Sequence, residues 1–421
     1  MPPLKISFNN RVDWRPVGLP GSKSIAARAL ICRYVAGLDT KLLNLPDCDD
    51  TCELAAALER LRGAEAGKPM ALNAGNGGTS LRFLLALVAS LPGVDIELDC
   101  GDSLRHRPLS PLVDALRSIG AEIEYLREEG YPPLRIHGRR LRGGNVKVSS
   151  SASSQFVSAL MLASPLWETP MTLESPELVS KPYIEMTRRV MERFANRPTV
   201  FEVEGDWSAA AFFYELALAV PGRVLEIDNL TPPEVSLQGD CAACGIFGFL
   251  GVNTEWRDGH AFLQTDVMAL EGLRKSGYIA DFDMNAVPDL VPPLSAALCM
   301  AGIPFNLTEI GHLKHKESDR LLALSTELPK AGYAVREGAD GEASPGRPDG
   351  RGCDSLIWNG RLCPVAGDEV FESWGDHRIA MVLSLLAARK GYVALRGAES
   401  VSKSFPGFFE TLERVGFTIG D

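Results

Sequence analysis

A recurring unit in the sequence limits the folds that are open to this chain. In each copy a helical pattern closes on a glycine and alternating apolar residues follow at once, as in Leu116–Ile123, Leu328–Val335 and Leu412–Ile419. Looser copies surround Gly63 and Gly245. Glycine commonly ends helices, and the alternation that follows predicts a strand. Five visible copies predict six units, three in each of two domains; one α/β sheet with chance similarity is the alternative.

The composition narrows the function classes. A chain of 421 residues usually exceeds one hydrophobic core, which favours two domains. The net charge of −11 argues against a nucleic-acid partner, so anionic ligands would need a local cluster of basic residues. Nine cysteines, an odd number, favour reduced thiols and a cytoplasmic protein. No apolar run is long enough for a membrane span or a signal peptide, so no membrane partner is expected.

The first basic motif follows Pro20-Gly21 and reads Ser22-Lys23-Ser24, with Arg28 one turn further on. Free N–H groups at a helix start favour anions, and Lys23 and Ser24 add donors beside them. Arg28 lies four residues after Ser24 and therefore on the same helix face. The motif predicts an anion site; a capped helix with solvated basic residues is the alternative.

Two further motifs precede helices. Asn76, Gly77 and Gly78 form a glycine-rich turn through which backbone could approach a ligand, although a tight strand-to-helix turn is the more common explanation. Arg107 stands directly before a proline that opens a helix, which would hold its guanidinium in place.

Hydroxyl and amide groups gather at two other predicted helix starts. They can wrap a phosphate or simply cap a helix. These groups are Ser153, Ser154, Gln155, Ser180 and Tyr183.

The second half of the chain combines acidic and basic groups. Asp289 begins an apolar helix, and Lys316 and Arg320 flank Glu317. Asp376-His377-Arg378 and Lys403 each place a cation near the end of an element. Any one of these could be a solvated face.

Taken together and in this order, the motifs resemble those of the EPSP synthase family of enolpyruvyl transferases, from Pro20 to Phe409. The resemblance implies two inside-out α/β barrel domains, each of three βαβαββ-like repeats, joined by a two-strand hinge. It implies a discontinuous domain of residues 1–17 and 206–421, and an inserted domain of residues 18–205 whose third repeat is shortened near 194–203. We expect a monomer that needs no cofactor and no metal.

The resemblance also implies transfer of the enolpyruvyl group of phosphoenolpyruvate to the 5-hydroxyl of shikimate 3-phosphate, with release of phosphate. Asp289, Glu317 and Lys23 would be catalytic. Shikimate 3-phosphate would be bound by Lys23, Ser24, Arg28, Ser153, Ser154, Gln155, Ser180, Tyr183, Asp289, His312 and Lys316. Phosphoenolpyruvate would be bound by Lys23, Asn76, Gly78, Arg107, Gln155, Glu317, Arg320, Arg378 and Lys403.

The sequence departs from the family pattern at a few positions. Gly77 and Phe83 replace the usual alanine and proline, and His312 stands where many members carry asparagine. Two other functions stay open. One is enolpyruvyl transfer to UDP-N-acetylglucosamine, which typically needs a loop cysteine; Cys100 lies just before the corresponding loop. The other is a non-catalytic sugar-phosphate-binding protein on the same scaffold.

Overall fold

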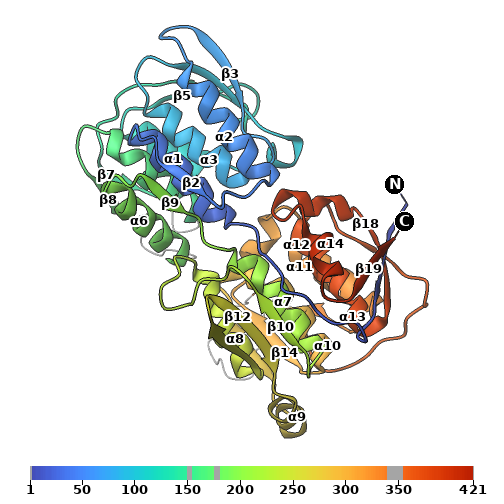
Figure 1. Cartoon of the computed structure of the whole chain (residues 1–421). Helices are drawn as coiled ribbons and strands as arrows, with labels where there is room; N and C mark the ends of the chain where they lie inside the picture. Colours follow the sequence, from blue (N-terminus) through green and yellow to red (C-terminus); the bar gives the residue numbers. More distant parts are fainter. Residues whose placement is uncertain (1, 149–153, 175–180, 339–353, 421) are drawn as a thin grey trace. The chain divides into compact units, whose positions relative to one another are not determined.

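The computed structural model describes residues 2–148, 154–174, 181–338 and 354–420 (Figure 1). The chain divides into two compact units. Unit 1 consists of Met1–Pro20, Gly205–Ser236 and Asp240–Asp421, and unit 2 of Gly21–Glu204 and Leu237–Gly239. The first segment of unit 1 thus extends beyond residue 17, because Val17 bridges to Ile227. No pattern in the sequence indicates that Leu237–Gly239 joins unit 2; there the Leu237 amide donates to the Glu204 carboxylate.

Unit 2 contains three sheets among its described residues. The largest follows a β-α-β-α-β-β order along the chain, with spatial order β3-β4-β6-β5. Its elements are β3 (Pro69–Asn73), α3 (Gly78–Ala89), β4 (Asp95–Asp99), η1 (Asp102–Leu104), α4 (Ser110–Ser118), β5 (Glu122–Tyr125) and β6 (Leu134–His137). The remaining elements are α1 (Lys23–Val35), β2 (Lys41–Leu43), α2 (Asp49–Arg62), β7 (Gly144–Lys147), α5 (Ser154–Ala163), η2 (Ser164–Leu166), β8 (Met171–Glu174), α6 (Lys181–Ala195) and β9 (Val200–Glu202).

The two smaller sheets of unit 2 are parallel pairs, β2 with β9 and β7 with β8. Helix α6 leads directly into β9, with no further strand in residues 196–199. The shortening of the third repeat near residues 194–203 stays a prediction.

Unit 1 contains three more sheets, with spatial orders β10-β12-β11, β13-β14-β16-β15 and β17-β18-β1-β19 within the part of the chain that is described. Its strands are β1 (Leu4–Phe8), β10 (Val224–Ile227), β11 (Val252–Arg257), β12 (His260–Thr265), β13 (Ala280–Asp283), β14 (Phe305–Thr308), β15 (Arg336–Glu337), β16 (Leu356–Trp358), β17 (Val370–Glu372), β18 (Tyr392–Arg396) and β19 (Phe417–Gly420). Its helices are α7 (Trp207–Ala219), η3 (Gly239–Cys241), α8 (Ala242–Phe249), α9 (Val267–Ser276), η4 (Pro288–Leu290), α10 (Val291–Ala301), η5 (Gly311–His315), α11 (Arg320–Lys330), α12 (His377–Leu385), α13 (Ala387–Lys390), η6 (Ala398–Lys403) and α14 (Phe408–Glu413).

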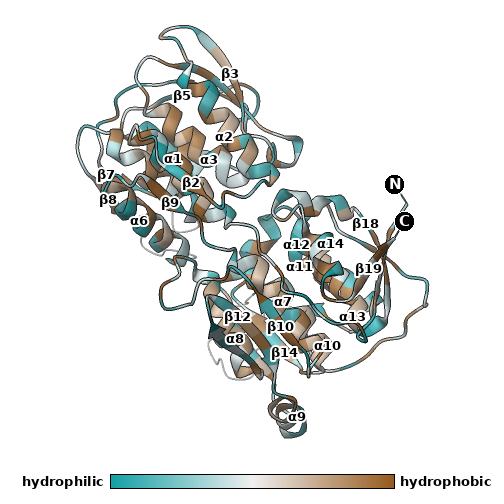
Figure 2. Ribbon diagram, in the orientation of Figure 1, coloured by the Kyte–Doolittle hydropathy of each residue, from teal (hydrophilic) through white to brown (hydrophobic). Residues whose placement is uncertain are grey.

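Helices form the centre of each unit. In unit 1, α7, α10 and α12 pack against one another and are buried along their whole length. In unit 2, α1, α3 and α5 also pack against one another, and α3 is buried at nearly every position. A helix that is mostly apolar around its circumference belongs inside a core, and Figure 2 shows the hydropathy of these helices. The mixed α/β prediction is confirmed.

The backbone angles of the repeat glycines explain why glycine recurs at the ends of these helices. Gly120, Gly332 and Gly416 have φ of 105°, 98° and 95°, a left-handed conformation that residues with a Cβ rarely adopt. The prediction that Gly245 ends the helix of its repeat was wrong, because Gly245 lies inside α8. The glycine between α8 and β11 is Gly251, with φ 96°.

No described helix combines the length and the apolar character needed to cross a bilayer.

Candidate active site

Helix α1 of unit 2 begins with the first basic motif. Lys23 is its first residue, and the Lys23 Nζ donates to the Asp50 Oδ2 at 2.8 Å. Asp50 lies in the first turn of α2, and no sequence motif pointed to it. Ser22 occupies the N-cap position, but its side chain caps nothing, and its buried Oγ has no partner among the described residues. The helix start therefore presents an ammonium and an uncommitted hydroxyl.

Arg28 lies one turn into α1 and is buried. Its Nε donates to the Thr187 Oγ1 at 2.7 Å and its Nη1 to the Ser24 carbonyl at 2.7 Å. Its Nη2 donates to the Ser158 Oγ at 3.3 Å and the Tyr183 carbonyl at 3.2 Å. No carboxylate pairs with it within the described residues. Burial accordingly lowers the pKa of the Arg28 guanidinium to about 10. Arg28 joins α1 to α5 and α6, and it is a buried cation without a counter-ion in the part of the chain that the structure describes.

Gly78 is the first residue of α3 and lies against two guanidinium groups. A Cβ added to Gly78 would come 2.8 Å from the Arg107 Nη1 and 2.9 Å from the Arg82 Nη1. Arg82, which the sequence analysis missed, is buried and donates to the Gly78 carbonyl at 2.7 Å. Phe83 is buried under the Arg28 guanidinium, 5.4 Å from its ring centroid, in a continuous helix. Phe83 thus supports a cation and does not interrupt α3.

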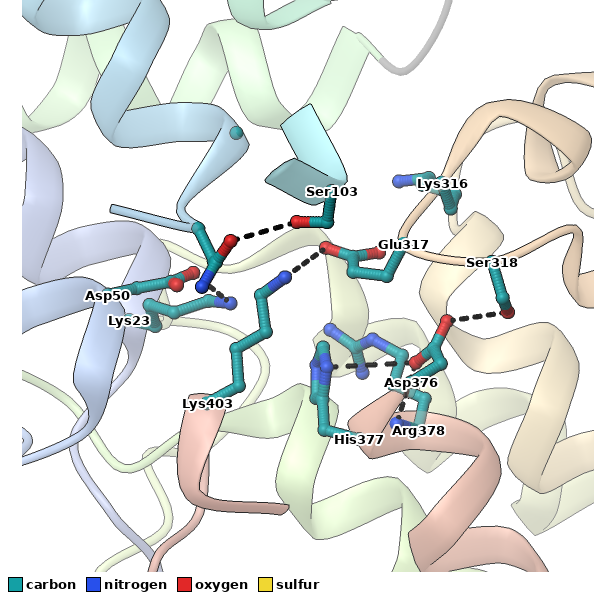
Figure 3. Close-up of polar contacts among 12 residues, drawn as sticks. Lys23, Asp50, Ser103, Lys316, Glu317, Ser318, Asp376, His377, Arg378 and Lys403 are labelled. Atoms are coloured by element: carbon teal, nitrogen blue, oxygen red, sulfur yellow. Dashed lines mark hydrogen bonds and ion pairs between the residues drawn. The ribbon is translucent and has the colours of Figure 1, made fainter. Parts of the chain in front are cut away.

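The other predicted residues of unit 2 lie at the starts of elements. Asn76 accepts from the Ser103 Oγ at 3.0 Å through its Oδ1 (Figure 3). Ser154 and Gln155 open α5, and Tyr183 lies in the first turn of α6. Ser153 and Ser180 fall outside the described residues.

Asp289 of unit 1 lies in η4, the 3₁₀ turn before α10. Its Oδ1 is 2.9 Å from the Arg320 Nη1 and 3.5 Å from the Lys316 Nζ, and its Oδ2 is 3.0 Å from the Arg378 Nη2. Burial alone would raise the pKa of the Asp289 carboxyl. The three nearby cations outweigh burial and hold this pKa well below its ordinary value.

Arg320 begins α11 and is held by three carboxylates. Its Nη2 donates to the Glu317 Oε2 at 2.8 Å, its Nε donates to the Asp376 Oδ2 at 2.8 Å, and its Nη1 donates to Asp289. The Arg320 side chain is 1% exposed and that of Asp376 0%. Asp376 also caps α12 and accepts from the Ser318 Oγ at 3.2 Å (Figure 3). Asp376 was recognised as part of a motif but was not predicted to have a role; its position just before α12 was the available signal.

Glu317 also approaches Lys403 in unit 1, with 3.9 Å between the Glu317 Oε1 and the Lys403 Nζ (Figure 3). Both side chains are mostly buried. Burial is the main cause that lowers the pKa of the Lys316 ammonium. Unit 1 therefore brings Asp289, Glu317, Lys316 and the two arginines together in one network.

His312 lies in η5, near this network. Burial, and then the charge of Lys316, lower the pKa of its imidazole to about 4. Its Nε2 is buried without a partner among the described residues. At neutral pH, His312 is therefore uncharged and offers one ring nitrogen, much as a neutral asparagine amide would offer its side chain.

Asp240, at the start of unit 1's last segment, was missed altogether. Burial and the Asp289 charge raise the pKa of its carboxyl to about 7, and the Ser208 Oγ donates to it. No motif in the sequence distinguishes this aspartate.

The fold is similar to that of solved enolpyruvyl transferase structures. EPSP synthase from Acinetobacter baumannii has a TM-score of 0.69 at 22% identity, with 99% of this chain and 100% of that chain covered. The enolpyruvyl transferase NikO from Streptomyces tendae has a TM-score of 0.69 at 16% identity, with 100% and 98% covered.

Sequence comparisons go further than the fold. The sequence model described as EPSP synthase (3-phosphoshikimate 1-carboxyvinyltransferase) matches residues 15–197 and 195–412. The 3-phosphoshikimate 1-carboxyvinyltransferase of Bacteroides fragilis is 34% identical, covering 96% of this chain and 95% of its own. That of Bordetella pertussis is 35% identical, with 94% of each covered. The chain belongs to the EPSP synthase family, and it is a transferase of the shikimate pathway.

Proposed function

We propose that Asp289, Glu317 and Lys23 carry the proton transfers of this family's reaction, and that the other residues named above hold shikimate 3-phosphate and phosphoenolpyruvate. The main support is the charge arrangement around Asp289. Lys316, Arg320 and Arg378 surround one carboxylate in an acidic protein. Together the two substrates carry two phosphates and two carboxylates, for which such cations are suited.

The reaction first joins two carbon skeletons. The 5-hydroxyl oxygen forms a bond to C2 of phosphoenolpyruvate, and its proton passes to Asp289. The C2=C3 electrons take a proton from Glu317, which makes C3 a methyl group. In the second step a C3 proton returns to the carboxylate, the double bond re-forms, and the C2–O bond to phosphate breaks. Lys23 donates a proton to the departing phosphate, and the proton that Asp289 took from the 5-hydroxyl returns to Lys23 through solvent, which restores both groups.

The state of Asp289 without substrates has a consequence for this mechanism. A carboxylate neutralised by three cations is a weak base, since its pKa lies well below the ordinary value. Substrate anions that engage Lys316 and Arg378 would weaken this neutralisation and raise the Asp289 pKa. Binding of the substrates would thus activate the base that acts on them.

Arg28 of unit 2 would bind shikimate 3-phosphate. No carboxylate among the described residues pairs with this buried cation, so an anion at the start of α1 would compensate its charge. Arg320 differs, because three carboxylates already engage it. A substrate carboxylate would compete with Glu317 and Asp289 for its donors.

Phosphate release from phosphoenolpyruvate tests this function when the acceptor is varied. We expect release with shikimate 3-phosphate and none with UDP-N-acetylglucosamine. Cys100 is buried, and burial raises the pKa of its thiol to about 11, which makes it a poor loop proton donor. Release with the UDP-sugar alone would favour that enzyme class. Tight binding of shikimate 3-phosphate without release would favour a binding protein.

A further inference from the structure

Three side chains with metal-ligating atoms lie on the outer face of the β10–β12 pair in unit 1. Leu225 and Ile227 of β10 are buried, so Glu226 and, one residue past the strand end, Asp228 point away from the core. Ile227 pairs with Ala261, which places His260 across from Asp228 at the next position of the antiparallel ladder. The strand backbone thus fixes the positions of two carboxylates and one imidazole.

The distances between the three ligand atoms are compatible with binding of one shared metal ion. The His260 Nδ1 lies 2.9 Å from the Glu226 Oε1 and 3.3 Å from the Asp228 Oδ1. All three ligand atoms lie within 4.8 Å of one another. Two ligands of a tetrahedral ion with bonds of about 2.1 Å are about 3.4 Å apart, so an ion fits with small side-chain adjustments.

Among the described residues, the two carboxylates have no basic partner other than His260, and the buried His260 Nδ1 makes no hydrogen bond of acceptable geometry. Arg257 faces His260 from β11, but Arg257 is paired with Glu255 and lies over the Phe262 ring.

We propose that Glu226, Asp228 and His260 bind a divalent transition-metal ion such as Zn²⁺. One imidazole with two carboxylates suits such an ion better than Mg²⁺, which prefers oxygen ligands and several waters. The side chains are about a third exposed, which leaves room for water as a fourth ligand.

The ion would have a structural role, because the same residues anchor the segment that leads out of unit 1. The Val17 amide donates to the Glu226 carbonyl at 2.9 Å, and the Asp228 amide donates to the Val17 carbonyl at 3.0 Å. Asn229 then bonds both the amide and the carbonyl of Leu19. Ligation would therefore fix the end of β10 to which residues 17–19 attach.

Zinc titration of the chelator-treated full chain by calorimetry tests the site. We expect one Zn²⁺ per chain with a dissociation constant in the micromolar range, and no Mg²⁺ binding at the same concentrations. His260→Ala and Asp228→Asn should each weaken this binding at least tenfold. His137→Ala is the matched control, because His137 faces one carboxylate, Asp95, whose two oxygens Arg135 already occupies.

A second readout separates this site from the free cysteines. Zn²⁺ should raise the melting temperature of the wild type and of His137→Ala, but not that of His260→Ala. Turnover should be equal in all three proteins without metal. Undiminished Zn²⁺ affinity in both His260→Ala and Asp228→Asn would overturn the proposal, as would a wild type that binds no Zn²⁺ at millimolar concentration.

Discussion

The two units hold their buried arginines in opposite ways. Arg28 in unit 2 is bound by hydroxyls and backbone carbonyls, whereas Arg320 in unit 1 is bound by Asp289, Glu317 and Asp376. Accordingly, burial lowers the pKa of Arg28, while carboxylates overcome burial and raise that of Arg320. Unit 2 thus contains a cation whose charge a substrate anion can compensate. In unit 1 the cations control the protonation of the carboxyl groups that they contact. We infer that unit 2 mainly binds and unit 1 mainly moves protons.

The largest expected effect comes from Glu317. Glu317→Gln keeps the size of the side chain but removes the transferable proton, so kcat should fall by about 10²–10⁴ with little change in substrate affinity. Steady-state kinetics and calorimetric binding measure the two quantities. Glu59→Gln, at an exposed site on α2, is the control. Near-normal turnover in Glu317→Gln would remove it from the mechanism and leave Lys23 or water as the donor.

The next effect compares the two arginines directly. Arg320→Met removes the cation that three buried carboxylates share and should lower the free energy of unfolding by about 3–5 kcal/mol. Arg28→Met leaves only neutral oxygens and should cost about 1–3 kcal/mol. Urea denaturation measures both. An equal loss of unfolding free energy in both variants, or a larger loss in Arg28→Met, would contradict the proposed difference between the two units.

A pH series on stability tests the depressed pKa of Asp289. A carboxyl whose pKa is lower in the folded state contributes stability above its unfolded pKa of about 3.9, and loses it as pH falls through the folded value. The excess stability of the wild type over Asp289→Asn should therefore shrink as pH falls below 4, from a value in the range of about 1–3 kcal/mol. The comparison is made below pH 4 because Asp240, whose pKa the Asp289 charge helps to raise to about 7, also titrates differently in the variant at higher pH. Asp368→Asn, at an exposed site, should show no such excess. An excess that grows between pH 4 and pH 2 would mean that the Asp289 pKa is raised.

The smallest effect concerns the start of α3. In Gly78→Ala the new methyl group would press on the Arg107 and Arg82 guanidinium ends, which are flexible enough to shift. We expect the KM for phosphoenolpyruvate to rise about tenfold, equivalent to about 1.4 kcal/mol, with kcat changed less. Gly37→Ala is not a usable control because its φ is 59°; Gly407→Ala, with open space around the Cβ, is suitable. An unchanged KM in Gly78→Ala would remove this turn from the phosphoenolpyruvate site.

Much of the fold could be predicted because the repeats carry a local signal. Gly120, Gly332 and Gly416 are needed for a left-handed backbone, which the sequence shows directly. The signal was weaker in the two looser copies. Gly63 ends α2 with φ −87°, which is not left-handed, and in the other copy Gly251, not Gly245, has the left-handed backbone. The assignment of Leu237–Gly239 to unit 2 depends on a tertiary hydrogen bond to Glu204, which no local pattern records.

Site residues that belong to short charged motifs could be predicted from the sequence. Residues whose role depends on burial were harder to predict. Lys316, Glu317 and Arg320 share one short stretch of sequence, so their proximity followed from spacing. Asp240 and Asp50 gain their importance from partners far along the chain, which spacing cannot show. The depressed pKa of Asp289 likewise depends on Arg378 from α12.

Deuterium incorporation tests the central claim, that unit 1 carries the proton transfers at C3, most directly. In D₂O the addition step converts the methylene group of phosphoenolpyruvate to a methyl group, and elimination then removes one of its three hydrogens. We expect mass spectrometry to find deuterium in the enolpyruvyl group of the product formed by wild type and by Arg28→Lys. Glu317→Gln should form product, and incorporate deuterium, about 10²–10⁴ times more slowly. Product without deuterium from the wild type, or incorporation at the wild-type rate in Glu317→Gln, would contradict the account.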